Sequence, residues 1–185
     1  MAGPLSRGPA RWGRQRAAGS TRYPRRVDPY LASLLDRLGD EDPIAVLQAT
    51  PARLAELAER LGPAGWEAEV APGAWTFSET LAHLADVELA MGFRLRQAVA
   101  GTSTVQAFDQ DAWARRYRRL DPSLALEMLR AARAWNLALF ATFDLDDWLT
   151  DVVHPERGVE SVDVVVRYLA GHDLRHLDRL VTLLG

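Results

Sequence analysis

Residues 162–183 carry apolar side chains at alternating intervals of three and four, which is the spacing of one face of a buried α-helix. Two histidines, His172 and His176, occupy positions on this same face. Residues four apart on a helix are neighbours, so both imidazoles are expected side by side in the core. The apolar members of the face are Val162, Val165, Leu169, Leu180 and Leu183. The pattern requires a helix packed against other elements, with two polar rings inside the contact.

Other segments carry the start and stop signals of helices. Three pairs place a capping residue directly before a proline: Asp42-Pro43, Thr50-Pro51 and Asp121-Pro122. A proline at the first helical position costs no hydrogen bond, because that N–H has no partner within the helix. We predict a short turn at 43–48 and helices over residues 29–38, 51–61, 77–100, 122–143 and 162–184.

No segment repeats the alternation of apolar and polar residues that marks strands, and residues 144–160 are predicted to be a polar loop. The pattern predicts an all-α protein, a four-helix bundle with short extra helices. Residues 101–121 form a long connection between the second and third bundle helices. About 20 residues at up to ~3.3 Å each can travel the length of such a helix, so the next helix can run parallel to the previous one.

The composition indicates one globular domain, residues 27–185, within a chain of 185 residues that are 48% hydrophobic and 25% charged. The chain has no cysteine, which excludes disulfides, a thiolate nucleophile and cysteine-containing metal sites. No apolar run reaches the roughly 18 residues of a membrane span, and no signal-peptide pattern is present. We therefore expect a cytoplasmic protein without membrane contact.

Residues 1–26 are rich in Gly, Pro, Ala, Ser and Arg and show no apolar periodicity, which predicts a disordered basic tail. The alternative is a start codon placed too early, with Val27 as the true first residue. The tail holds seven of the 22 basic residues and no acidic one, which leaves 15 basic against 25 acidic residues in the body. Such an acidic body argues against nucleic-acid binding.

A third histidine, His83, lies at the edge of the apolar face of the predicted helix 77–100. Neutral imidazole is the most common protein metal ligand. Burying imidazoles without partners costs about 1–3 kcal/mol each, and metal ligation removes that cost. His83, His172 and His176 are therefore candidate ligands of one metal ion. The alternatives are hydrogen-bonded core histidines and rings that face solvent.

The neighbours of His83 on its helix are Glu79 and Asp86, one turn away on either side. Either carboxylate could hydrogen-bond to a non-ligating His83, or accept the proton of its free ring nitrogen if the other nitrogen binds metal. Thr76 and Glu79 match a capping box, so Asp86 is the better candidate for site chemistry. Asp173 points about 100° around its helix from His172 and is expected outside the metal ligands.

These residues together resemble the DinB-like family of bacterial metal-binding four-helix bundles, which is related to mycothiol- and bacillithiol-dependent transferases. The resemblance extends over residues 29–185. It rests on Trp75-Thr76, His83-x-x-Asp86-x-Glu88 followed by Arg94, the loop His154-Pro155-Glu156-Arg157-Gly158, and Gly171-His172-Asp173 followed by His176.

The resemblance implies an up-down-down-up bundle with the long crossover between its second and third helices. It implies that His83, His172 and His176 bind one divalent ion, zinc or nickel, near one end of the bundle, and that the protein forms a homodimer. In members of known activity, the metal activates the thiol of a low-molecular-weight cofactor such as mycothiol or bacillithiol.

We therefore expect an enzyme whose metal lowers the pKa of a bound thiol or water, for attack on a small electrophilic substrate in a transferase or hydrolase reaction. Asp86 would orient His83 or take a proton, and Arg94 would offer a cation near the site. Because the chain has no cysteine, any thiol must be external. The competing hypothesis is a non-catalytic metal-binding or stress-associated interaction protein, and a bundle without metal is the third.

Overall fold

The structure, a computed structural model, describes residues 28–185, so the predicted basic tail and the alternative start at Val27 lie outside the described residues. Four long helices form a bundle: α2 (Pro43–Trp66), α3 (Phe77–Val99), α5 (Pro122–Phe140) and α7 (Val162–Val181). The shorter elements are α1 (Pro29–Leu38), α4 (Gln110–Ala114), η1 (Tyr117–Arg119), α6 (Leu145–Leu149), β1 (Asp151–His154), β2 (Gly158–Ser161) and η2 (Thr182–Leu184). Among these helices, none combines the length and apolar composition that a membrane span requires.

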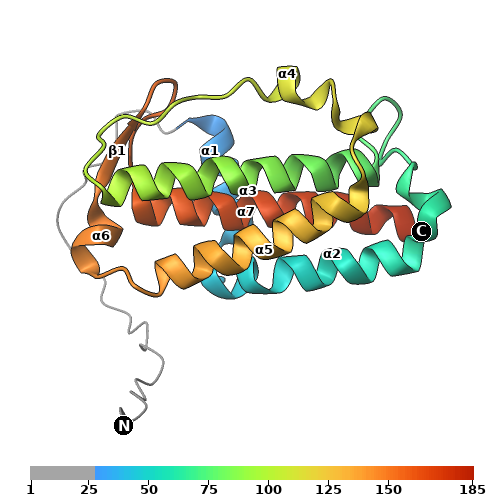
Figure 1. Ribbon diagram of the computed structural model, residues 1–185, viewed down its shortest axis with the longest axis horizontal. Helices are drawn as coiled ribbons and strands as arrows, with labels where there is room; N and C mark the ends of the chain where they lie inside the picture. The colour runs from blue at the N-terminus through green and yellow to red at the C-terminus, as the bar shows by residue number, and fades with distance from the viewer. Residues whose placement is uncertain (1–27) are drawn as a thin grey trace, which may run out of the picture.

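The helices run up, down, down and up, as Figure 1 shows. The green α3 and the yellow-to-orange α5 point in the same direction, and α2 and α7 point in the opposite one. The connection that carries α4 and η1 returns along the length of the bundle before α5 begins. α3 packs along α5, and α2 packs along α7. The predicted all-α bundle with its long crossover is confirmed.

The prediction of a separate turn at 43–48 and a new helix after Thr50 is wrong, because α2 is continuous across Pro51. Thr50 does not cap a helix; its hydroxyl donates to the Val46 carbonyl one turn earlier, at 2.9 Å. Pro51 has no N–H to offer to the carbonyl of Leu47, and Nη1 of Arg133 donates to that carbonyl instead, at 2.7 Å. The predicted end at Gly62 is present as a kink, where φ is 63°.

Residues 144–160 contain more structure than the predicted polar loop. They hold α6 and most of a two-stranded antiparallel hairpin, in which Val152 pairs with Glu160 and His154 with Gly158. The backbone of Val153 also bonds to Ser103 and Val105, so the hairpin fastens the start of the crossover. Strands of four residues are too short to show a clear alternation, which explains the wrong prediction.

The helix starts that matter for the site follow their sequence signals. Thr76 and Glu79 form the predicted capping box at the start of α3. The side chain of Ser161 accepts from the Val164 amide at the start of α7. α1 lies against α7 at Gly171, where a Cβ atom would stand 2.1 Å from the carbonyl oxygen of Leu34. Glycine is therefore required for α1 to pack in this position.

Candidate metal centre

Three histidines from two helices meet in the core between α3 and α7. Nε2 of His172 lies 3.1 Å from Nε2 of His83 and 3.2 Å from Nε2 of His176. One ring nitrogen from each residue can be chosen so that all three lie within 4.8 Å of one another. Their exposed fractions are 1% for His83, 2% for His172 and 8% for His176. The fold thus brings His83 of α3 next to His172 and His176 of α7, which lie 89 or more residues later in the chain.

Burial keeps all three rings neutral. It lowers the pKa of His83 to about 4 and, together with the neighbouring His83 and two arginines, that of His176 to about 3. The pKa of His172 falls well below its usual value, because its ring is buried between the other two. At neutral pH each imidazole therefore has one nitrogen with a free lone pair, which is the form that binds metal.

The distances from Nε2 of His172 to the other two Nε2 atoms suit nitrogens bound to one tetrahedral ion. Two nitrogens bound at about 2.0–2.1 Å with a tetrahedral angle lie about 3.3 Å apart, close to the 3.1 and 3.2 Å found here. Hydrogen bonding accounts less well for the arrangement. Nε2 of His172 has either one proton or one lone pair, so hydrogen bonds to both neighbours would have to share it. A metal ion accepts all three lone pairs at once.

Aromatic rings surround the cluster. The Trp75 ring lies 4.7 Å from the His83 ring, and Tyr117 lies 6.4 Å from it. The ring of Tyr168 stacks on His172 with centroids 6.0 Å apart and planes at 16°. Tyr168 is a site residue that the sequence motifs did not identify. Its position one turn before His172 is the signal that could have identified it.

The predicted partner for the free nitrogen of His83 is wrong. Nδ1 of His83 has no hydrogen-bond partner among residues 28–185, and neither has Nδ1 of His172. Glu79 is engaged elsewhere, since its carboxylate accepts from the Thr76 amide at 2.9 Å and from Nε of Arg118 at 2.9 Å. Glu79, one turn before His83, therefore uses its carboxylate to cap α3 and to pair with Arg118.

Asp86 lies one turn after His83 and is half-buried. Burial raises the pKa of its carboxyl, and the hydroxyl of the adjacent Tyr117 partly offsets this effect. Burial and the charge of Asp86 in turn raise the pKa of Tyr117. Asp86 and Tyr117 thus lie near each other on the His83 side of the cluster, and the Tyr117 hydroxyl makes no hydrogen bond within residues 28–185.

A buried ion network holds the two histidine-bearing helices in register. Arg133 of α5 donates to Oε2 of Glu88 on α3 at 2.9 Å and to Oδ2 of Asp173 on α7 at 2.7 Å. All three side chains are at most 2% exposed. Asp173 therefore points away from the rings, as its place on the helix suggests, and Glu88 acts in the same network. Asn136 adds a 2.7 Å hydrogen bond to Glu88.

Arg94 lies further along α3 than His83, and its expected role as a cation near the site stays a prediction. It follows His83 by eleven residues, which is about 16 Å along α3. Its Nε donates to the Gln106 carbonyl at 3.0 Å, and its guanidinium lies over the ring of Phe108. Arg94 instead lines a groove that extends to Tyr168, the residue that stacks on His172.

The comparison with protein families agrees with this geometry. A family model described as the DinB superfamily matches residues 47–179, a span that contains all three histidines. The chain belongs to the DinB superfamily. The resemblance inferred from the sequence motifs is thereby confirmed.

Three bacterial proteins are similar to this chain in sequence. YfiT of Bacillus subtilis is 22% identical over 144 residues, which is 76% of this chain and 81% of YfiT. Two proteins of Oceanobacillus iheyensis are 32% and 26% identical, over 57% and 60% of this chain. The chain covers 62% and 66% of their respective lengths. The names of all three relatives describe metal-dependent hydrolases, an activity that was assigned to them by inference.

Solved structures show the same bundle. YfiT from Bacillus subtilis, described as a probable metal-dependent hydrolase with an unusual four-helix bundle topology, has a TM-score of 0.72 at 21% identity. The match covers 76% of this chain and 83% of that one. A mycothiol-dependent maleylpyruvate isomerase has a TM-score of 0.62 at 15% identity, over 79% of this chain and 62% of that one. At these identities the likeness establishes the DinB fold.

Proposed function

We propose that His83, His172 and His176 hold one divalent metal ion through Nε2, and that the protein uses it to hydrolyse a small electrophilic substrate or to transfer a thiol to it. The convergence of the three Nε2 atoms in one buried cluster is the observation that carries this proposal. The ligand set suits zinc and nickel among other divalent ions. The names of the relatives support metal-dependent hydrolysis.

A divalent ion held by three histidines keeps an open coordination position, and there it lowers the pKa of water or a thiol. We assign to Asp86 the acceptance of the proton that the nucleophile loses. Asp86 lies one turn from His83, and its raised pKa makes it a stronger base than an exposed carboxylate. The rings of Trp75 and Tyr117 restrict water beside His83.

The sequence relatives and the solved structures support different nucleophiles for the proposed reaction. The names of the sequence relatives describe hydrolases, which favours water as the nucleophile. The structural likeness to a mycothiol-dependent isomerase, together with the motif resemblance, favours an external thiol such as mycothiol or bacillithiol. The chain has no cysteine, so a thiol reaction requires that cofactor.

Turnover assays test the proposed reaction. Metal-loaded protein is mixed with a panel of esters, amides and electrophilic small molecules, each with and without a low-molecular-weight thiol. We expect turnover that His172→Ala abolishes while the circular dichroism of the bundle is retained. Arg130→Met, which changes an exposed residue of α5 outside the cluster, should keep metal-dependent turnover. Metal binding without turnover across the panel would instead support the non-catalytic metal-binding or stress-associated protein.

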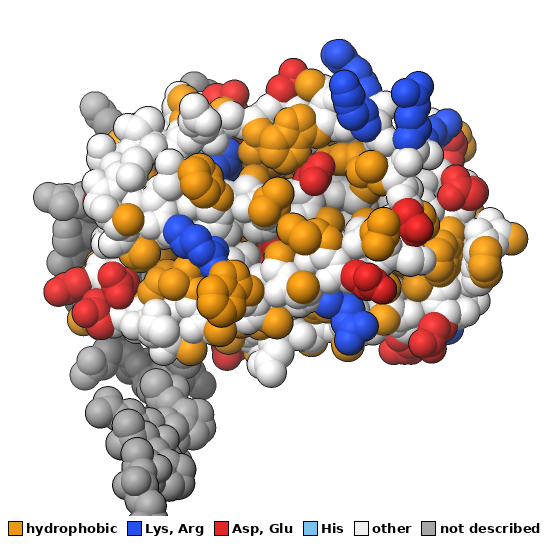
Figure 2. Space-filling model, in the orientation of Figure 1, with side chains coloured by type: hydrophobic (Ala, Val, Ile, Leu, Met, Phe, Trp, Pro, Cys, Tyr) orange, Lys and Arg blue, Asp and Glu red, His pale blue; other side chains and the backbone are white. Residues whose placement is uncertain are grey.

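We also propose that the protein forms a homodimer through the exposed face of α3 and α5. Leu89, Phe93 and Trp135 on this face are 54%, 60% and 69% exposed, and Figure 2 shows apolar side chains gathered over these two helices. A groove of about 440 Å³ runs between them over Gly92 and Ala132. A second copy can place its own aromatic side chains in this groove by two-fold symmetry, which is the common form of dimer interface.

A further inference from the structure

Arg94 is a buried cation without a carboxylate partner. Arg94 is 6% exposed. Its guanidinium bonds only to neutral groups, the Gln106 carbonyl and the Met91 sulfur, and lies 5.1 Å from the centre of the Phe108 ring. No ion pair forms between Arg94 and any carboxylate of residues 28–185, and residues 1–27 contain no Asp or Glu.

The contrast with Arg133 shows why this is unusual. Arg133 is also buried, and two carboxylates neutralise it. A buried charge without a counter-charge is expensive, so proteins pair such groups or use them to bind ligands. Burial lowers the pKa of Arg94, and the nearby charge of Arg157 lowers it further. Glu156 and Glu160 offset part of this effect, but neither carboxylate forms an ion pair with Arg94.

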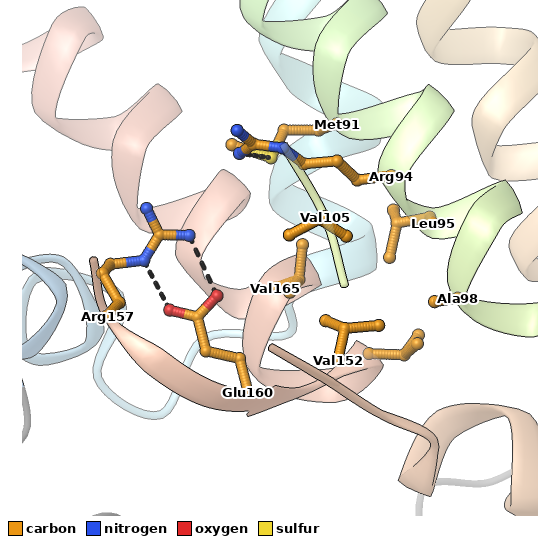
Figure 3. A pocket seen from close by; sticks show the side chains of 10 residues that line it. Met91, Arg94, Leu95, Ala98, Val105, Val152, Arg157, Glu160 and Val165 are labelled. Atoms are coloured by element: carbon orange, nitrogen blue, oxygen red, sulfur yellow. Dashed lines mark hydrogen bonds and ion pairs between the residues drawn. The ribbon is translucent and has the colours of Figure 1, made fainter. Parts of the chain in front are cut away.

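Arg94 lines an open groove of about 630 Å³ between the crossover, the hairpin and α7. Figure 3 shows Arg94 from α3 and Arg157 from the hairpin on the same side of the small apolar pocket beneath, with Arg157 paired to Glu160. That lower pocket holds only about 10 Å³, about the volume for one water molecule. A ligand must therefore reach Arg94 from the open groove.

His154 supplies a further donor to the groove. Its Nδ1 accepts from the backbone amides of Glu156 and Arg157, both at 3.3 Å. In the neutral ring the proton is then on Nε2, which makes that atom a donor. The groove also contains the exposed carboxylates of Asp109, Asp111 and Glu156, and none of them pairs with Arg94. The 154–158 loop, which the sequence identified only as a motif of the family, thus contributes hydrogen-bond donors to the groove.

We propose that this groove binds the anionic group of a small ligand, a carboxylate or a phosphate, with Arg94 as its counter-charge and His154 and Arg157 as further donors. The groove reaches the histidine cluster through Tyr168, which lines it and stacks on His172. If the cluster acts as proposed above, Arg94 selects substrates that carry an anionic group away from the reacting centre. That extension rests on the proposed function, whereas anion binding itself does not.

Thermal unfolding and isothermal titration calorimetry with sodium phosphate and sodium succinate test the site, with sodium chloride at matched ionic strength as the reference. We expect phosphate and succinate each to raise the Tm of the wild type, with a rise that saturates as the anion concentration increases. Arg94→Met should abolish the rise and weaken binding about tenfold or more, because a charge-assisted hydrogen bond is lost. Arg94→Lys keeps the charge and should retain weaker binding. The tighter of the two anions identifies the group.

Arg130→Met is the matched control, since it removes one exposed arginine of α5 with the same change in net charge. It should bind both anions as the wild type does. His176→Ala separates this proposal from the metal proposal, because anion binding should persist when the metal site is damaged. The anion site is ruled out if phosphate and succinate shift Tm no more than chloride does, or if Arg94→Met and Arg94→Lys both bind them as tightly as the wild type.

Discussion

Nη1 of Arg133 lies 2.7 Å from Oδ2 of Asp173, the residue that directly follows His172. The same nitrogen donates to the Leu47 carbonyl at 2.7 Å, and the other side of the guanidinium pairs with Glu88. One side chain of α5 therefore ties together the three other helices of the bundle. The position of His172 relative to His83 depends on this buried network as much as on apolar packing.

Replacing Arg133 with methionine should destabilise the fold strongly. The substitution leaves the Glu88 and Asp173 carboxylates buried without a cation, and breaking such a pair costs about 3–5 kcal/mol. Urea denaturation followed by circular dichroism measures the change. Arg130→Met, on the exposed side of the same helix, should change the free energy of unfolding by about 0.5 kcal/mol or less. Similar stability for both variants would show that the network contributes little.

Replacing Gly171 with alanine should displace α1 or destabilise the protein by about 1–3 kcal/mol. The added Cβ would meet the backbone of Leu34 at 2.1 Å, and a backbone carbonyl cannot rotate away as a side chain can. Gly65→Ala is the control, because its Cβ would meet only side-chain atoms of Leu61, the nearest being Cβ at 3.1 Å, and no backbone atom. Equal unfolding free energies for the two variants would contradict the close packing of α1 on α7.

Protein stripped of metal should lose stability as the pH falls below about 6.5. The unfolded histidines bind protons there, while the folded His83 and His176 stay neutral down to about pH 4 and 3. The unfolded state binds more protons in this window, so stability falls by roughly 1.4 kcal/mol per pH unit for each histidine. Denaturation curves between pH 4 and 7 measure the slope. A His83→Gln and His176→Gln double variant should show a clearly smaller slope, and an unchanged one would argue against buried neutral rings.

Replacing Phe93 or Trp135 with glutamate should convert the proposed dimer to a monomer, because a charge would be buried in the apolar face between two copies. Sedimentation velocity at several protein concentrations measures the change. Leu145→Glu is the control, since Leu145 is 71% exposed at another part of the surface. A wild-type protein that stays monomeric at high concentration, or a dimer that survives both substitutions, would exclude this interface.

The sequence predicted those parts of the structure that depend on local periodicity and capping. The helical spacing placed His172 and His176 on one buried face, and the capping box at Thr76 marked the start of α3. The continuity of α2 was not predictable in this way. It depends on Arg133, 86 residues away, which satisfies the carbonyl that Pro51 leaves without a donor. Local sequence carries no signal for such a tertiary hydrogen bond.

The site shows the same division. Because His83 lies at the edge of the apolar face of its helix, the sequence identified it as a candidate, but only the fold shows its Nε2 3.1 Å from that of His172. The surroundings of Arg94 also come only from the fold. Eleven residues of helix separate it from His83, and its guanidinium turns toward the crossover at Gln106. The contacts of Tyr117 in the crossover had no sequence signal.

The metal content of the protein, purified without a His tag and loaded with zinc or nickel, tests the central claim most directly. Elemental analysis by mass spectrometry should give one ion per chain for the wild type and for His154→Ala. His172→Ala should lose the ion while its circular dichroism stays that of a helical bundle. A wild type that retains no more metal than a folded variant lacking His83, His172 and His176 would contradict the claim that these rings form a metal site.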